Sequence, residues 1–253
     1  MLTLPAVAKT LGDEACYFDL DILAECGSTN AELLARAEAG APSGAALAAE
    51  NQTAGRGRRG RTWVSAPGDS LTFSLLWRFP PGTELSGLSL AVGVALVRAL
   101  DHETGLQLKW PNDLLKFGRK LAGVLIEGVP GQPGAVVIGV GVNLRLPAAL
   151  PDELRATSAA LTSTDDPNLL LAALLKALRE MLLDFAQRGF GARRQEWLAR
   201  CLHMDTEITL LSDFAPPRIG RCRGVAADGA LLLETETGIE RIISGEVSLR
   251  LVP

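Results

Sequence analysis

Residues 52–78 read QTAGRGRRGRTWVSAPGDSLTFSLLWR, a loop rich in glycine and arginine followed by alternating apolar and polar residues. The apolar positions of this alternation are Leu71, Phe73, Leu75 and Trp77. A period of two predicts a β-strand over 70–78. The spacing Gly55-x-Gly57-x-x-Gly60 matches the dinucleotide-binding fingerprint, but that motif requires a helix directly after its glycines. Because a strand follows instead, we reject a Rossmann fold.

The loop over 52–61 concentrates positive charge, with four arginines among the six residues from 56 to 61. Glycine lets backbone N–H groups approach a ligand closely, and an arginine fork grips phosphate or carboxylate through two parallel hydrogen bonds. We therefore expect the loop to bind an anion and to be mobile when empty, since its charges repel one another. An exposed basic loop that binds RNA is the alternative.

Periodicity on either side of this loop predicts further helices and strands. Apolar residues at helical spacing predict helices over 29–40, 88–103, 167–188 and 192–200. Strands are predicted over 17–25, 44–50, 106–110, 120–128 and 135–142. Thr29-x-x-Glu32 fits a capping box at the start of the first helix, and Asp166 with Pro167 fits the start of the longest.

The sequence pattern changes after about residue 205. Short apolar segments follow, separated by turn signals such as Asp228 with Gly229: EITLL, RIGRCRGVAA, ALLLETE, IERIIS and EVSLRLV. They predict a small five-stranded β-barrel. We therefore predict an α+β protein, with a mixed β-sheet and helices over 1–204 and a small all-β domain over 205–253.

Composition excludes several classes of protein. The 253 residues are 47% apolar and 21% charged, which indicates a globular chain, and a net charge of −4 gives no overall attraction for DNA or anionic lipid. We expect no membrane span and no secretory signal, and four scattered cysteines predict reduced thiols in the cytoplasm. With two histidines, we expect neither a structural zinc site nor a histidine-activated nucleophile.

Other segments combine polar groups with turns or strand ends. They are STN (28–30), KWPNDL (109–114), KLAGVLIE (120–127) and VGVN (140–143). Each also has a purely structural interpretation: a helix cap, an Asn–Asp turn, a surface lysine at a strand end, and a strand-end turn. Gly123 in mid-strand instead indicates close approach of a ligand or of another backbone. Taken one at a time, these segments leave both interpretations open.

In this order, the Arg–Gly loop with Trp63 and these segments resemble the biotin protein ligases, that is, biotin–[acetyl-CoA-carboxylase] ligases. The loop and KWPNDL are the specific parts of the resemblance, whereas GVGVN and STN are weak alone. The likeness extends from about residue 20 to the end, because residues 245–250 resemble the family's C-terminal barrel. It implies a class II synthetase-like catalytic core over 1–204, which binds biotin and ATP, and an SH3-like barrel over 205–253.

The resemblance also implies roles for individual residues. The implied biotin-binding residues are Ser28, Thr29, Asn30, Gln52, Gly55, Arg56, Gly57, Arg58, Lys120 and Gly123. The implied ATP-binding residues are Arg58, Arg61, Trp63, Asn112, Asp113, Lys120 and Asn143. Lys120 and Arg58 are the implied catalytic residues, and Asp113 is the candidate Mg²⁺ ligand. Glu246 and Arg250 are expected to approach the nucleotide from the barrel.

Such an enzyme activates biotin as biotinyl-5′-AMP and transfers it to a lysine of a biotin carboxyl carrier protein domain. The segment before residue 20 is too short for the DNA-binding domain that some family members carry, so no DNA partner is expected. A twofold-symmetric homodimer is the expected assembly. The alternatives are a lipoate or octanoate ligase of related fold, an RNA-binding module, and a biotin sensor without catalysis.

Overall fold

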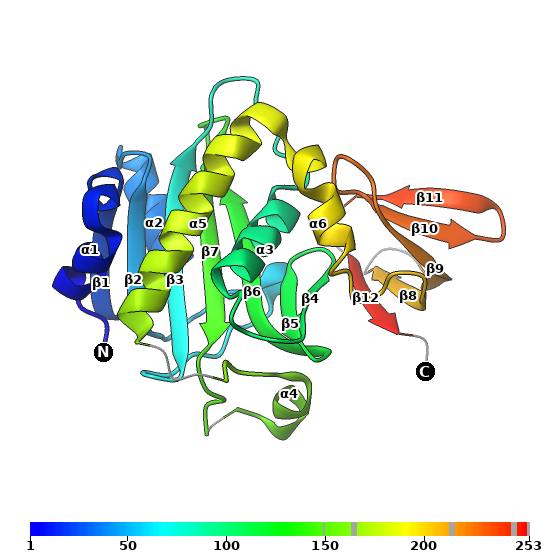
Figure 1. Ribbon diagram of the computed structural model, residues 1–253, viewed down its shortest axis with the longest axis horizontal. Coiled ribbons are helices and arrows are strands. Elements are labelled where there is room, and N and C mark those ends of the chain that lie inside the picture. Colours follow the sequence, from blue (N-terminus) through cyan, green and yellow to red (C-terminus); the bar gives the residue numbers. More distant parts are fainter. Residues whose placement is uncertain (149, 163–165, 213–215, 244–246, 252–253) are drawn as a thin grey trace.

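The computed structural model describes residues 1–148, 150–162, 166–212, 216–243 and 247–251. Its larger part is a seven-stranded sheet formed by β1 (Asp19–Cys26), β2 (Ala45–Gln52), β3 (Ser70–Arg78), β4 (Leu106–Lys109), β5 (Asp113–Lys116), β6 (Arg119–Gly128) and β7 (Ala135–Asn143). The strands lie in the order β1-β2-β3-β7-β6-β5-β4 (Figure 1). β1 and β2 are parallel and the other neighbours antiparallel, so the predicted mixed sheet is confirmed.

Helices lie on both faces of this sheet. They are α1 (Leu4–Leu11), α2 (Thr29–Glu38), α3 (Leu88–Ala99), α4 (Asp152–Thr157), α5 (Pro167–Arg188) and α6 (Arg194–Leu198), with 3₁₀ turns η1 (Gly12–Tyr17), η2 (Arg58–Gly60) and η3 (Phe190–Arg193). Figure 1 shows α1, α3 and α5 over one face. α2 connects the parallel strands β1 and β2, and its Leu33 and Ala37 pack against Leu76 and Val137 on the opposite face.

Burial follows the predicted periodicities in the centre of the core. β7 is buried along its whole length, and so is the apolar stripe predicted for α5, which consists of Leu170, Leu174, Leu178, Met181 and Phe185. Full burial of one such side chain contributes about 1.5–3 kcal/mol. The strand that follows the Arg–Gly loop is β3, which lies between β2 and β7. The chain that leaves the Arg–Gly loop therefore enters the middle of the sheet at Ser70.

Some local predictions are wrong. The helix predicted over 88–103 ends at Ala99, because Leu100 already has ψ of 30° and the residues after it form turns. Residues 113–116 form β5, which pairs with β4 and β6, where the sequence predicted a turn at Asn112 and Asp113 with no strand after it. The sequence pattern also did not predict α1 and α4. These elements are short, and pairing or packing with distant segments determines them.

The C-terminal part is an antiparallel sheet of β8 (Glu207–Ser212), β9 (Arg218–Val225), β10 (Leu231–Thr235), β11 (Gly238–Ile242) and β12 (Val247–Leu251), in the order β11-β10-β9-β8-β12. The predicted strands are present. Within the part of the chain that is described, they form a five-stranded sheet in which no pairing joins β11 to β12. The SH3-like barrel implied by the resemblance stays a prediction. Glu246 and the side chain of Arg250 lie outside the described residues. The boundary at 204/205 stays a prediction.

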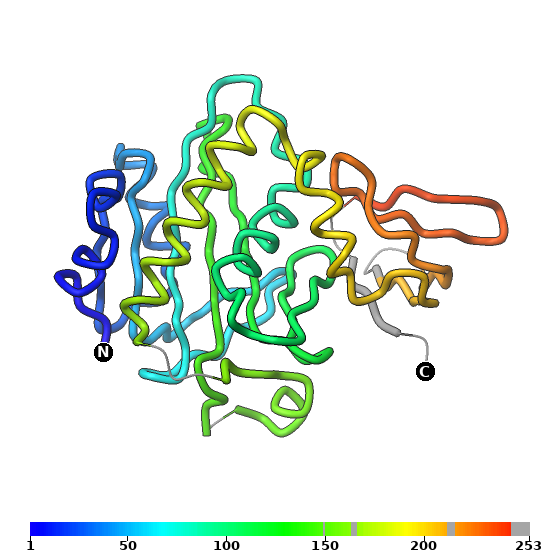
Figure 2. The backbone as a smooth tube through the Cα atoms, viewed as in Figure 1, coloured from blue at the N-terminus to red at the C-terminus, as the bar shows by residue number. Residues whose placement is uncertain are grey.

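The C-terminal sheet is attached to the core beside β4 and the start of α3 (Figures 1 and 2). Trp110 Nε1 donates a hydrogen bond to the backbone oxygen of Gly229 at 3.1 Å. A Cβ at Gly229 would lie 2.6 Å from Gly87 Cα, so the two backbones are in direct contact there. The C-terminal sheet therefore contacts the KWPNDL turn through Trp110 and helps to hold it in place.

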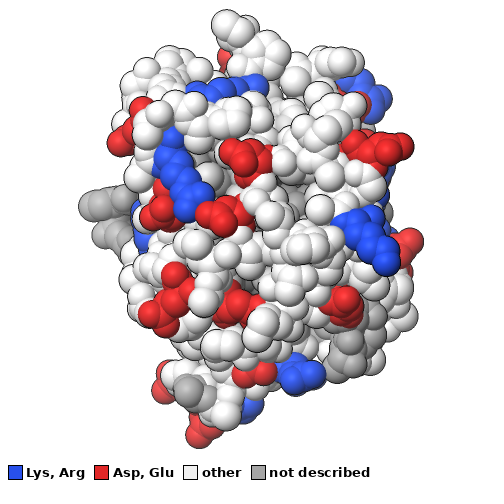
Figure 3. All heavy atoms as spheres, turned by 90° about the vertical axis from the view of Figure 1, so that its left-hand side faces the viewer, with Lys and Arg blue, Asp and Glu red and all other residues white. Residues whose placement is uncertain are grey.

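Two points raised by the sequence can be examined on the surface of the structure: the expected absence of a membrane span, and RNA binding as an alternative function. No described helix combines the length and apolarity needed to cross a bilayer. On the face drawn in Figure 3, acidic and basic side chains are interspersed and form no continuous basic surface. Nucleic-acid binding without such a surface lacks its main driving force, so this face gives no support to the RNA-binding alternative.

Candidate active site

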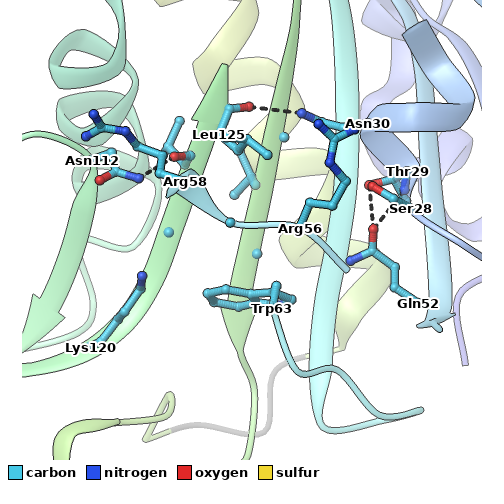
Figure 4. A pocket seen from close by; sticks show the side chains of 16 residues that line it. Ser28, Thr29, Asn30, Gln52, Arg56, Arg58, Trp63, Asn112, Lys120 and Leu125 are labelled. Atoms are coloured by element: carbon cyan, nitrogen blue, oxygen red, sulfur yellow. Dashed lines mark hydrogen bonds between the residues drawn. The ribbon is translucent and has the colours of Figure 1, made fainter. Parts of the chain in front are cut away.

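A small cavity lies under the Arg–Gly loop, against β6 and β7 (Figure 4). The sequence-predicted residues that line it are Ser28, Thr29, Asn30, Gln52, Arg56, Gly57, Arg58, Trp63, Asn112, Lys120 and Gly123. The rest of its lining, absent from the prediction, is Val124, Leu125, Gly139, Val140 and Gly141. Its volume is about 60 Å³. The cavity is partly open to solvent, and it adjoins a larger one of about 490 Å³ that shares Arg58, Asn112 and Val124.

The indole ring of Trp63 occupies much of the space above the sheet. A Cβ at Gly141 would lie 2.4 Å from Trp63 Cε2, and one at Gly123 would lie 3.2 Å from Trp63 Cζ3. These glycines face each other across the β6–β7 pair. Trp63 Nε1 is buried and has no hydrogen-bond partner among the described residues. A buried N–H normally finds an acceptor, so Trp63 Nε1 is an unused donor beside the cavity.

One end of the cavity carries neutral polar groups at the start of α2. Gln52 Oε1 accepts hydrogen bonds from the backbone N–H of Thr29 at 2.8 Å and from its hydroxyl at 3.1 Å (Figure 4). The predicted capping box is wrong: Ser28 is the N-cap residue without a side-chain cap bond, and Glu32 pairs with Arg36. The side chains of Ser28 and Thr29 are therefore not used to cap α2.

The other end is cationic. Lys120 Nζ lies 2.7 Å from Asp113 Oδ1 and 5.6 Å from the centre of the Trp63 ring. Burial lowers the pKa of Arg58 and the neighbouring Arg59 and Arg61 add to this, while Asp113 opposes it. Arg56 on the same loop pairs with Glu127 at 2.5 Å. Binding an anion here would relieve the repulsion among these arginines.

Asn112 and Asn143 both have structural partners. Asn112 Nδ2 donates to the backbone oxygen of Val124 at 2.6 Å, which holds the KWPNDL turn against β6. Asn143 Nδ2 donates to the backbone oxygens of Lys120 and Ala159, at 3.3 and 3.0 Å. Both amide protons of Asn143 are thus in use, and it fixes the backbone of Lys120 without lining the cavity.

Gly55, Arg61 and Asp113 also lie outside the cavity lining. A Cβ at Gly55 would lie 2.4 Å from the backbone oxygen of Trp63, so only glycine fits there. Arg61 is exposed, and its backbone oxygen accepts from the N–H of Gly57 at 2.7 Å. These contacts shape the loop.

Asp113 is the candidate metal ligand, and its surroundings allow a test of fit. No group of three or more His, Cys, Asp or Glu side chains gathers to hold a metal within the described ranges. Mg²⁺ needs no such cage, because it is usually bound by one or two carboxylates together with substrate phosphates. A single carboxylate beside Lys120 fits that mode of binding, with the remaining ligands from the substrate and water.

The arrangement suits a particular kind of ligand. Neutral hydrogen-bonding groups lie at one end, two glycines open the middle, and Lys120 with Arg58 lies at the other end. A ligand with a polar head, a slender apolar linker and an anionic end would meet matching groups along its length. The cations at that end would also stabilise a second anion approaching the first.

Comparisons with known proteins agree with this geometry. Residues 27–143 match the Biotin/lipoate A/B protein ligase family, and residues 219–250 match the Biotin protein ligase C terminal domain. The bifunctional ligase/repressor BirA of Salmonella typhimurium is 36% identical over 98% of this chain and 81% of its own length. The biotin–[acetyl-CoA-carboxylase] ligase of Paracoccus denitrificans is 36% identical over 89% of this chain and 98% of its own.

Solved structures give the same result. The biotin protein ligase of Aquifex aeolicus, in complex with biotin and ATP, has a TM-score of 0.80 and 32% sequence identity. The match covers 92% of this chain and 99% of that one. Sequence and fold thus agree along nearly the whole chain, and the chain belongs to the biotin protein ligase family.

Proposed function

We propose that the protein is an ATP-dependent biotin protein ligase, which forms biotinyl-5′-AMP and transfers the biotinyl group to a lysine of an acceptor protein. The observation that carries the proposal is a single cavity that joins the Gln52–Thr29 pair to Lys120 and Arg58 beneath the Arg–Gly loop. Family membership and the Aquifex aeolicus complex with biotin and ATP support the same assignment.

In the first half-reaction, a carboxylate oxygen of biotin attacks the α-phosphorus of ATP, and pyrophosphate leaves. Both partners are anions, so the step needs positive charge at the meeting point. A cation about 4 Å from the reacting oxygens contributes roughly 4 kcal/mol at an effective dielectric constant of 20, or about a thousandfold in rate. We assign this role to Lys120, with Arg58 on the phosphate. Ser28, Thr29 and Gln52 would hydrogen-bond the ureido ring.

In the second half-reaction, the amine of an acceptor lysine attacks the carbonyl carbon of the mixed anhydride. AMP leaves with the electron pair of the broken C–O bond, and an amide forms. No protein nucleophile is required. The loop over 52–61 has a second task, because biotinyl-AMP hydrolyses in water and acylates other lysines. A loop closed over the adenylate excludes water until the acceptor arrives.

Mg²⁺, when bound with ATP, would shield the triphosphate charge and polarise its phosphoryl oxygens. Asp113 is the residue that would hold it, and the ion pair between Asp113 and Lys120 would then be exchanged for contacts with substrate. Asn112 would keep its bond to Val124 and fix the turn beside the nucleotide.

The proposal includes the partners and the compartment. The acceptor is a biotin carboxyl carrier protein domain, because relatives are named for acetyl-CoA carboxylase. We infer a cytoplasmic enzyme on the composition alone. A net charge of −4 supports the expectation that DNA is not a partner, and the homodimer stays a prediction for sedimentation analysis.

Exchange of labelled pyrophosphate into ATP tests the proposal. We expect exchange that depends on biotin and Mg²⁺, and that lipoate or octanoate does not support at equal concentration. A lipoate or octanoate ligase would instead support pyrophosphate exchange with lipoate or octanoate and not with biotin. Binding of labelled biotin without any exchange would indicate the sensor alternative and would exclude the ligase.

A further inference from the structure

Glu127 near the end of β6 contacts both the Arg–Gly loop and the start of α2, although the sequence did not single it out as a site residue. One carboxylate oxygen accepts from Arg56 Nη2 at 2.5 Å, and the other accepts from Asn30 Nδ2 at 2.8 Å. We propose that Glu127 is a positioning residue, which holds the loop through Arg56 and orders the ring-binding hydroxyls through Asn30. The proposal rests on the proposed function.

The side-chain amide of Asn30 has one chemically sensible orientation. Its Nδ2 faces two acceptors, the Glu127 carboxylate and the backbone oxygen of Leu125 at 3.2 Å. Its Oδ1 therefore faces the hydroxyl of Ser74, at 2.6 Å. An amide turned the other way would set its oxygen against a carboxylate. Glu127 and the backbone oxygen of Leu125 thus together determine which end of the Asn30 amide faces Ser74.

This orientation in turn fixes the proton of Ser74. A hydroxyl has one proton to donate, and Ser74 Oγ lies within hydrogen-bond distance of both Asn30 Oδ1 and Thr29 Oγ1. Since Asn30 Oδ1 can only accept, it takes that proton. The hydroxyl of Thr29 is then the donor toward Ser74 or Gln52 Oε1. A chain of polar contacts, each within hydrogen-bond distance, therefore runs from Glu127 through Asn30 and Ser74 to Thr29. The single proton of the Thr29 hydroxyl is shared between Ser74 Oγ and Gln52 Oε1 as alternative acceptors.

The backbone of β7 is built to admit this chain. A Cβ at Gly139 would lie 2.2 Å from Asn30 Oδ1, so any larger residue would displace the amide. Asn30 and Ser74 are both buried, where a wrongly paired polar group is costly. The glycine leaves room for Asn30, and the carboxylate orients it.

The ion pair itself contributes little to stability. The Arg56 side chain is 47% exposed and that of Glu127 is 21% exposed, and pairs as exposed as this one usually stabilise a fold only slightly. Removal of the Glu127 charge should therefore leave the fold intact while it disorders the loop and the hydroxyl chain. This difference separates a positioning role from a structural one.

The test compares Glu127→Gln with a matched control, Glu25→Gln. Glu25 also accepts a hydrogen bond from an asparagine amide, Asn51 Nδ2 at 2.8 Å, but on the exposed edge of the sheet. For E127Q we expect biotin to bind about tenfold or more weakly, the equivalent of one lost hydrogen bond to a charged group. Escape of biotinyl-AMP, followed as labelling of a bystander protein, should rise. The melting temperature should stay within about 3 °C of the wild type.

The variant Arg56→Gln allows a second test, in which Glu127→Gln is compared with and without it. If Glu127 acts partly through Arg56, E127Q should cost less in the R56Q background than in the wild type, and full additivity would contradict the coupling. Should E127Q melt early, E127D replaces it, because the shorter side chain keeps the charge but does not reach both donors. Wild-type biotin affinity and retention in these Glu127 variants overturn the inference. Absence of exchange in the wild type would instead overturn the proposed function.

Discussion

Lys120 lies where several features of the chain meet. Its ammonium group contacts Asp113 and lies over the ring of Trp63, while its backbone oxygen accepts from Asn143. Gly123 leaves the space for it, since a Cβ there would be 3.2 Å from Lys120 Nζ. The backbone of Lys120 is thus fixed before any substrate binds, while its ammonium group can exchange Asp113 for the substrate anions.

Lys120→Ala should lower biotin-dependent pyrophosphate exchange by about a hundredfold or more, because it removes the cation at the meeting point of two anions. The matched control is Lys176→Ala, which removes a lysine from an exposed ion pair with Glu14 on the far surface of α5. Initial rates at saturating ATP and biotin give the comparison. Exchange retained by K120A would remove Lys120 from the catalytic role.

Single residues explain how much of the site the sequence could predict. The Arg–Gly loop was predictable as an anion site because four arginines spaced by glycines have few structural explanations. Lys120 and Gln52 lie in strands, and they were predicted as site residues only through the family resemblance. Gly139, Gly141 and Glu127 were not, since each lies in an apolar strand whose spacing is satisfied by sheet formation alone. Their roles depend on Asn30, Trp63 and Arg56, which reach them only in the folded chain.

At the scale of elements, a buried ion pair ties three segments together. Lys116 on β5 pairs with Glu103, which follows α3, at 2.5 Å, and both are buried. Glu103 also accepts from the backbone N–H of Thr162 at 2.6 Å and from its hydroxyl at 2.9 Å. Thr162 lies beyond α4, in the stretch that returns from β7 past Lys120. Glu103 therefore anchors the chain that borders the site.

Glu103→Gln should destabilise the fold by about 3–5 kcal/mol at pH 7, because it leaves Lys116 buried without a counter-charge. Burial alone would raise the pKa of Glu103, but Lys116 and Thr162 outweigh it and hold that pKa below its ordinary value. The carboxylate thus contributes stability above its unfolded-state pKa, and this contribution is lost as the pH falls through the folded-state pKa. Urea unfolding at pH 7 and below pH 4 measures both effects.

The control for this variant is Glu196→Gln, whose carboxylate pairs with Arg98 on the surface. An exposed pair of this kind contributes at most about 1 kcal/mol. A similar loss of stability in E196Q and E103Q would show that burial is not the cause of the effect.

The helices and strands also differ in how well the periodicity of the sequence predicted them. β3, β7 and α5 followed from their patterns: α5 buries the apolar stripe that its sequence defines, and β7 is apolar and buried along its whole length. β3 alternates as predicted, although its polar positions Thr72 and Ser74 are buried as well. β5 has four residues, and its pairing with β4 and β6 makes it a strand. The strand order of the C-terminal sheet could not be predicted, since five short apolar strands fit an open sheet and a barrel equally well. Whether the edge strands of such a sheet pair with each other depends on contacts between distant segments, which a local sequence pattern does not predict.

At the scale of the whole molecule, the junction between the core and the C-terminal sheet contains a buried histidine. His203 is 3% exposed, and neither ring nitrogen has a hydrogen-bond partner within the described part of the chain. Burial lowers the pKa of His203 to about 4, and the positive charge of Lys109 acts in the same direction. Lys109 begins the KWPNDL turn, which includes Asn112 of the cavity lining. The charge that acts on His203 therefore belongs to a segment that also reaches the site.

His203 should make the protein sensitive to mild acid. With a folded-state pKa of about 4 and an unfolded-state value near 6.5, the unfolded chain binds more protons below pH 6.5, so stability falls as the pH drops. The loss from this group is about 2 kcal/mol at pH 5. His203→Leu should therefore lose about 2 kcal/mol less than the wild type between pH 7 and pH 5. Urea unfolding at each pH measures it, with exposed His102→Gln as the control. Equal pH dependence in H203L and the wild type would show that His203 is not the group that titrates at this junction.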